Sequence, residues 1–229
     1  MILALILIVI IMWIWYMHMI KPTCNIISLE DLFDPLLTNL KSGDLILFKS
    51  LNNLNSIYMC NYFTHIGMVI IDPILTNNQP YIFEASGTST MKWKGRDDVS
   101  DNIKSIFLSP LKERMKRYLG YVYYKPLSHS ITKEMHYKLL NFIFYAMKYM
   151  SYNYNILGGC IKKKFMNEKC GNKTNCGELI FLCLINMGLL NTKYWCKSIF
   201  HYLKWMCNIK NLTQGYNYNK TYEIKKTTI

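Results

Sequence analysis

The stretch that decides the fold is NCGELIFLCLI, residues 175–185. Asn175 is a favoured N-cap residue, and Glu178 completes the spacing of a capping box before the apolar run that follows. The pattern predicts a helix that begins near Cys176 and ends at Gly188. Cys176 then lies in the first turn, where unpaired backbone N–H groups and the helix dipole stabilise a thiolate.

The position of Cys176 leaves two interpretations open. A thiolate in the first turn can attack a carbonyl carbon, and the N–H groups of that turn can hold the resulting oxyanion. The alternative is a small buried cysteine that opens a core helix, which is the usual environment of this residue. The helix start alone does not separate the two.

Short β-rich runs precede this helix, each bounded by glycine, proline or asparagine. They predict strands over residues 44–48, 65–71, 81–85, 103–108 and 119–124. Apolar residues at helical spacing then predict a long helix over 132–150. Strands followed by helices in this order indicate an α+β domain with an antiparallel sheet.

Two of these strands carry candidate partners for Cys176. His65 begins one strand, and a histidine at that edge can face a helix start packed on the sheet and take the thiol proton. Glu84 lies near the end of another, where a carboxylate can orient the imidazole by accepting its other N–H. Each also has a structural interpretation, His65 as a hydrogen-bonded core histidine and Glu84 as a surface carboxylate.

Four ordered strings carry a family resemblance. They are GDLILF at 43–48, THIGMV at 64–69, FEASG at 83–87 and NCGELI at 175–180. In this order they resemble the circularly permuted branch of the NlpC-like papain-fold superfamily. That branch includes bacterial YiiX-like proteins, the lecithin:retinol acyltransferase group and a virion-associated group of poxviruses and related large DNA viruses. MSYN at 150–153 is similar to the tyrosine-containing segment that comes before the nucleophile helix.

The resemblance implies a permuted papain-like (NlpC-type) domain in which Cys176 is the nucleophile, His65 the general base and Glu84 the third, orienting group. The acyltransferase group usually has a second histidine at the third position, so Glu84 is more similar to the YiiX and viral groups. Gly177 stands where many relatives have serine, a change that affects no reacting group.

The expected activity is that of a cysteine-dependent hydrolase or acyltransferase acting on an amide or ester, of a peptide or a lipid, through a thioacyl intermediate. No cofactor and no metal are expected. The alternative is a catalytically weak structural or interaction protein of a viral membrane that retains the papain-like fold. A basic lipid-binding module is a third, less favoured class.

The first twenty residues contain no Asp, Glu, Lys or Arg. A helix of that length would span about 30 Å, the thickness of a bilayer's hydrocarbon core. We therefore expect a transmembrane anchor, in preference to a signal peptide or a buried helix, because a basic start and a small-residue cleavage site are both missing. The apolar run is followed by Lys21, Lys41 and Lys49, which predicts that the rest of the chain forms a domain on the cytosolic side of the membrane. A virion membrane is the alternative location of the anchor.

Composition limits the partners. The net charge of +13 comes from 24 Lys and 3 Arg against 14 acidic residues. Because base recognition favours arginine, we expect no specific nucleic acid, and an anionic membrane surface is the better candidate. A hydrophobic fraction of 51% excludes an intrinsically disordered chain. The eight cysteines include no Cys-x-x-Cys pair, and the histidines have no partner at metal-ligand spacing.

The expected domain organisation has four parts. They are a transmembrane anchor (1–20), a linker (21–42), the permuted papain-like cysteine hydrolase domain (43–190) and an aromatic, basic C-terminal extension (191–229). Loops 50–62 and 87–102 are expected to build the substrate pocket, and they carry no motif that names a substrate or an oligomeric state.

Overall fold

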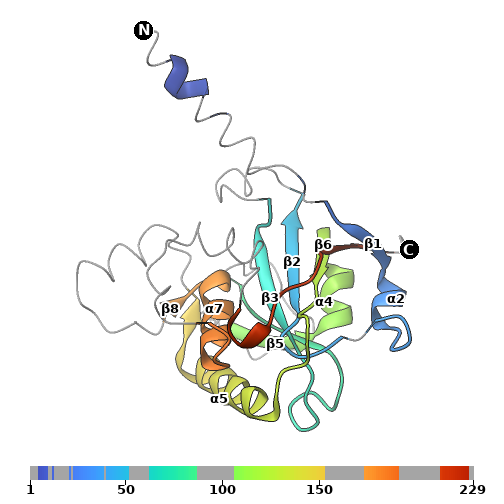
Figure 1. The fold of residues 1–229 in the computed structure, drawn as a ribbon, viewed down its shortest axis with the longest axis vertical. Helices are drawn as coiled ribbons and strands as arrows, with labels where there is room; N and C mark the ends of the chain where they lie inside the picture. Colours follow the sequence, from blue (N-terminus) through green and yellow to red (C-terminus); the bar gives the residue numbers. More distant parts are fainter. Residues whose placement is uncertain are drawn as a thin grey trace, which may run out of the picture.

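A seven-stranded sheet organises the chain (Figure 1) in the computed structural model, which describes residues 5–9, 12, 21, 23–38, 40–51, 62–86, 106–152, 173–190 and 212–226. Its strand order is β1-β9-β6-β2-β3-β4-β5. The strands are β1 (Asn25–Ser28), β2 (Leu45–Ser50), β3 (His65–Ile70), β4 (Tyr81–Ala85), β5 (Ile106–Pro110), β6 (Gly120–Lys125) and β9 (Tyr222–Lys225). All neighbours in this sheet are antiparallel except β1 and β9, so the described chain has a mixed α+β fold.

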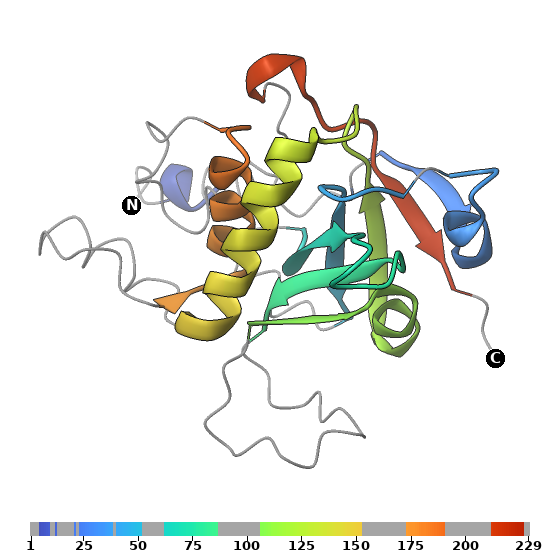
Figure 2. The same cartoon turned by 90° about the horizontal axis from the view of Figure 1, so that it is seen from below.

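Helices cover both faces of the sheet, as Figure 2 shows. On one face lie α5 (Lys133–Tyr149) and α7 (Cys176–Asn186), and on the other lie α2 (Leu29–Phe33) and α4 (Leu111–Arg117). A short 3-10 turn, η2 (Thr213–Gly215), precedes β9, and a separate two-stranded parallel sheet joins β7 (Ser151–Tyr152) to β8 (Lys173–Thr174).

The sequence of β2 explains how one strand serves two cores. Successive side chains of a strand point to opposite faces. Leu45 and Leu47 pack in the cluster that contains α5 and α7, whereas Ile46 and Phe48 pack in the cluster that contains α2 and α4. All four are fully buried, so the unbroken apolar run reflects a strand covered on both sides.

The Gly43–Asp44 turn fixes the start of β2. Gly43 has a φ of +97°, a conformation that strains residues with a Cβ. The buried Asp44 carboxylate accepts hydrogen bonds from the Leu127 N–H and the Tyr124 hydroxyl, both at 2.8 Å. The turn therefore ties the beginning of β2 to the end of β6.

The sheet also uses segments on either side of residues 43–190, the predicted domain. Strand β1 lies in the segment expected to be a linker, and β9 lies in the expected C-terminal extension. Strand β9 pairs with both β1 and β6, and its Ile224 side chain is buried in the cluster around α2 and α4. The first and last strands in the sequence, β1 and β9, thus lie side by side in the sheet.

The predicted transmembrane helix over residues 1–20 is not supported. No helix within the described ranges is long and apolar enough to cross a bilayer. Of these twenty residues the structure describes 5–9, which are helical, and 12. The fold class is therefore corrected to a mixed α+β fold with a seven-stranded sheet, in which the described residues give no support for a transmembrane helix.

Several sequence-based expectations fall on residues that the structure does not describe. Loop 87–102 lies entirely outside the described residues, and so does loop 50–62 except for residues 50, 51 and 62. The aromatic segment at 191–211 also lies entirely outside them.

Replacement of Ile224 by alanine tests the contribution of β9. Ile224→Ala should lower the free energy of unfolding by about 2–4 kcal/mol, because it leaves a cavity between the sheet and its helices. The neighbouring Lys225 is exposed, so Lys225→Ala is the matched control and should change stability by less than about 0.5 kcal/mol. Urea unfolding followed by circular dichroism measures both; equal effects would contradict the packing of β9.

Candidate active site

The start of α7 positions Cys176. The Asn175 side chain accepts a hydrogen bond from the Glu178 N–H at 2.9 Å, and the Asn175 carbonyl accepts one from the Leu179 N–H. This is the N-cap that the sequence predicts. The cap leaves the N–H groups of Cys176 and Gly177 outside the intrahelical hydrogen bonds, at the open end of the helix. Cys176 is a free thiol and only 4% exposed.

His65 is the first residue of β3, as expected from the sequence. It pairs across the sheet with Phe48 of β2, and the two ring centroids lie 5.3 Å apart. Helix α7 packs against β3, and Cys176 lies near enough to the His65 imidazole to raise its pKa. Its Nε2 lies 2.5 Å from Oε2 of Glu84. Because Nε2 is engaged by the carboxylate, Nδ1 is the ring nitrogen left for the thiol.

Glu84 lies in β4 and is completely buried, not on the surface. Its neighbours Phe83 and Ala85 pack in the cluster around α5 and α7. By the alternation of a strand, Glu84 points to the opposite face, toward α4. His65, the first residue of β3, thus lies between a thiol on the α7 side of the sheet and a carboxylate on the α4 side.

Arg114 is the member of this cluster that sequence reasoning missed. Its Nε donates to Glu84 Oε1 at 2.5 Å, and its Nη2 donates to Glu84 Oε2 at 3.1 Å. A signal is present in the sequence of α4. Leu111, Arg114 and Met115 have the i, i+3, i+4 spacing of one helix face, and all three are buried. An arginine on an otherwise apolar face indicates a buried acidic partner.

The charges of this cluster are strongly coupled. Burial opposes ionisation of Glu84, but hydrogen bonds and charges from His65 and Arg114 outweigh it and lower the pKa of the carboxyl to about 2. Burial also disfavours the protonated imidazole, yet the charges and hydrogen bonds of Cys176 and Glu84 raise the pKa of His65 to about 9. The arrangement therefore favours a proton on His65 and a negative charge on Glu84.

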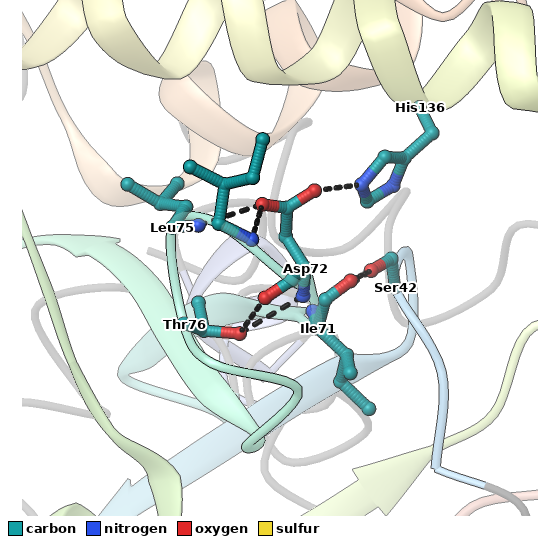
Figure 3. A network of polar contacts seen from close by, with 7 residues as sticks. Ser42, Ile71, Asp72, Leu75, Thr76 and His136 are labelled. Atoms are coloured by element: carbon teal, nitrogen blue, oxygen red, sulfur yellow. Dashed lines mark hydrogen bonds and ion pairs between the residues drawn. The ribbon is translucent and has the colours of Figure 1, made fainter.

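A second histidine–carboxylate pair lies elsewhere, between His136 of α5 and Asp72 after β3 (Figure 3). The other oxygen of Asp72 accepts the N–H groups of Ile74 and Leu75, which holds a turn. Ser42, the nearby hydroxyl, donates to the Ile71 carbonyl and accepts from the Ile71 N–H. With both functions of the hydroxyl occupied, this network holds the turn against α5 and presents no free nucleophile.

The sequence analysis also considered metal binding and the remaining histidines. Within the described ranges, no three His, Cys, Asp or Glu side chains form a group that could hold a metal ion. His129 is exposed and its ring lies 6.0 Å from that of Tyr216. His201 lies outside the described residues.

Comparisons with known proteins show a weak structural similarity. No protein-family model matches the sequence, and no curated protein matches it. The chain is similar to the crystal structure of metalloprotein YiiX from Escherichia coli, at 16% sequence identity and a TM-score of 0.42. The match covers 64% of this chain and 66% of that one, just under two thirds of its length. No family model and no curated protein supports the viral or the circularly permuted part of the predicted resemblance.

The coupling of His65 to Glu84 predicts a displaced titration. The His65 imidazole should titrate near pH 9, and Glu84→Gln should lower this midpoint by about one pH unit or more, because the compensating charge is lost. NMR of the histidine-labelled chain measures both midpoints. A midpoint that does not respond to Glu84→Gln would contradict the ion pair.

The same displacement predicts how stability depends on pH. A raised folded-state pKa means that the native state holds its proton more tightly than the unfolded chain. The stability contributed by protonated His65 is complete below about pH 6.5 and is lost as the pH rises to about 9. The urea midpoint should therefore fall across this window, and fall less in Glu84→Gln.

Proposed function

We propose that this chain is a cysteine-dependent hydrolase or acyltransferase that cleaves an amide or an ester through a thioacyl intermediate. In this proposal Cys176 is the nucleophile, His65 the general base and Glu84 the group that orients the imidazole. The observation that carries the proposal is the His65–Glu84 hydrogen bond next to Cys176, which lies in the first turn of a capped helix packed against the strand of His65.

The first half-reaction uses the thiol and the imidazole. The proton on His65 is the one that the imidazole takes from Cys176 before the attack, and the sulfur then attacks the substrate carbonyl carbon while the C=O electron pair moves to oxygen. When the tetrahedral intermediate collapses, the C–N or C–O bond breaks and His65 gives its proton to the leaving amine or alcohol. The acyl group stays on Cys176 as a thioester.

The second half-reaction returns the free enzyme. Water, in a hydrolase, or another nucleophile, in an acyltransferase, loses a proton to His65 and attacks the thioester carbonyl. The Cys176 thiolate then leaves and recovers its proton from His65. The two activities differ only in the acceptor, so the same three side chains serve either one.

The helix start supplies the electrostatic part of catalysis. The backbone N–H groups of Cys176 and Gly177 point out of the first turn, where the helix dipole favours negative charge. They are the donors available to the oxyanion of each tetrahedral intermediate. Glu84 holds the ring by accepting from Nε2, which leaves Nδ1 to serve the sulfur.

Alkylation tests whether Cys176 is reactive. Iodoacetamide near pH 7 should label Cys176 much faster than Cys183, because only Cys176 has an adjacent histidine and a place in the first helical turn. Cys183 is the matched control, since it lies on the same helix and burial raises its pKa well above the usual value. Peptide mass spectrometry measures both rates; equal rates would count decisively against a thiolate at Cys176.

Substitutions separate the roles of the three residues. Cys176→Ala should abolish turnover of chromogenic esters or fluorogenic amides, and His65→Ala should reduce it by about 10²–10⁴-fold. Glu84→Gln should reduce it substantially but less than Cys176→Ala. Because the residues act as a unit, the Cys176→Ala/His65→Ala double variant should be scarcely worse than Cys176→Ala alone.

Glu178→Gln is the control for these measurements. Gln at this position still completes the capping box, so turnover should remain nearly intact. Circular dichroism checks the folding of every variant. Loss of activity in Glu178→Gln but not in Glu84→Gln would contradict the assignment of the third residue. A broad panel without any Cys176-dependent turnover would overturn the proposed function.

A further inference from the structure

Arg114 approaches the site from the side of the sheet opposite α7. It projects from α4, whose Leu111 and Met115 pack against the α4 face of the sheet. The side chain is 3% exposed, so the guanidinium is almost completely removed from water. Burying such a charge costs several kcal/mol unless a partner compensates it. The Glu84 carboxylate is the acidic group that it contacts.

Aromatic rings fix the plane of the guanidinium. Its central carbon lies 4.7 Å from the centroid of the Phe48 ring and 5.4 Å from that of Tyr118. The Phe48 ring also lies beside His65, at 5.3 Å. Stacking on Phe48 and Tyr118 restricts the rotation of the Arg114 fork, which therefore presents a fixed pair of donors to Glu84.

The hydrogen bonds divide the carboxylate between two cations. Oε1 of Glu84 accepts a hydrogen bond from Arg114 Nε, whereas Oε2 accepts from both Arg114 Nη2 and His65 Nε2. Arg114 thereby determines which oxygen faces the imidazole and in which plane. Its Nη1 is buried and has no partner among the described side chains and backbone, so the fork is committed to Glu84 alone.

We propose that Arg114 is the positioning residue of this site: it holds the Glu84 carboxylate ionised and turned toward His65, and so supports the proton transfer from Cys176. This inference rests on the proposed function, because it assigns Arg114 a part in that reaction. Arg114 touches no reacting atom and acts through Glu84. A merely structural ion pair would stabilise the fold without controlling the charge that His65 experiences.

The groups around Glu84 determine the expected pH dependence. It is faced by His65 from β3 and Arg114 from α4, with Cys176 of α7 beyond the imidazole. Tyr118 follows α4, and Lys226 after β9 donates to the Tyr118 carbonyl. Without Arg114, burial raises the pKa of Glu84 from about 2 because one of its two cations is gone. Glu84 then takes up a proton at mildly acid pH.

The direct test follows the Glu84 carboxyl by ¹³C NMR in the full chain, with the signal assigned by its absence from Glu84→Gln. Arg114→Met keeps most of the side-chain volume and removes the charge, so the Glu84 midpoint should rise by about 1–3 pH units. Arg114→Lys keeps the charge without the fork and should limit the rise to less than about one pH unit. Arg117→Met is the matched control: its side chain is 56% exposed on the same helix, and the midpoint should not move.

The functional readout is the alkylation rate of Cys176 by iodoacetamide at pH 4 and pH 8. In Arg114→Met the ratio of the pH 4 rate to the pH 8 rate should fall by roughly tenfold, because Glu84 loses its charge only at the acid end. In a Glu84→Gln background the same substitution should leave this ratio unchanged, since Arg114 acts through Glu84. An equal fall in that background would overturn the proposal.

Every other outcome also decides the question. A Glu84 midpoint that is the same in the unaltered chain, Arg114→Met and Arg114→Lys overturns the proposal. If Arg114→Met does not fold, Arg114→Lys decides: a folded Arg114→Lys in which Glu84 titrates near pH 4.5 overturns the proposal. If neither variant folds, Arg114 is required for folding and the proposal is rejected. Neither readout needs a substrate, so absence of turnover contradicts only the proposed function, whereas indifference to Arg114 contradicts only this inference.

Discussion

The buried charge of Glu84 is the constraint on which the described site depends. A carboxylate without solvent exposure requires cationic partners. Here the partners are His65, the first residue of β3, and Arg114 of α4. Both partners must be in place together. The sheet therefore has to bring β3 and β4 side by side, and α4 has to pack on the face of the sheet opposite α7.

The two-sided sheet explains why the site needs so much of the chain. Cys176 enters with α7 on one face, Glu84 points to the other, and His65 connects them at the strand end. Strands β1 and β9, which lie far apart in the sequence, complete the sheet beside β6. The packing on the two faces of the sheet thus places Cys176 of α7, His65 of β3 and Glu84 of β4 next to one another.

That arrangement is what the proposed chemistry requires: a nucleophile at a helix start, a base next to it, and a carboxylate that holds the base. The weak similarity to YiiX concerns the fold and leaves the chemical argument to the residues themselves. The second pair, Asp72 with His136, shows the contrast. Its nearby hydroxyl is already bonded to backbone groups, so the same two residue types there hold a turn.

The sequence alone determined the local features: the cap at Asn175, the place of Cys176 in the first turn, and strands that carry His65 and Glu84. These signals act within about four residues, so local chemistry is sufficient to read them. The prediction of a transmembrane helix from the apolar run over 1–20 was wrong, because no helix among the described residues is long and apolar enough to cross a membrane. Only the tertiary structure decided the joining of β1 to β9, the burial of Glu84 and its ion pair with Arg114. Thirty residues separate the members of that pair, and the packing of α4 on the face of the sheet to which Glu84 points brings them together.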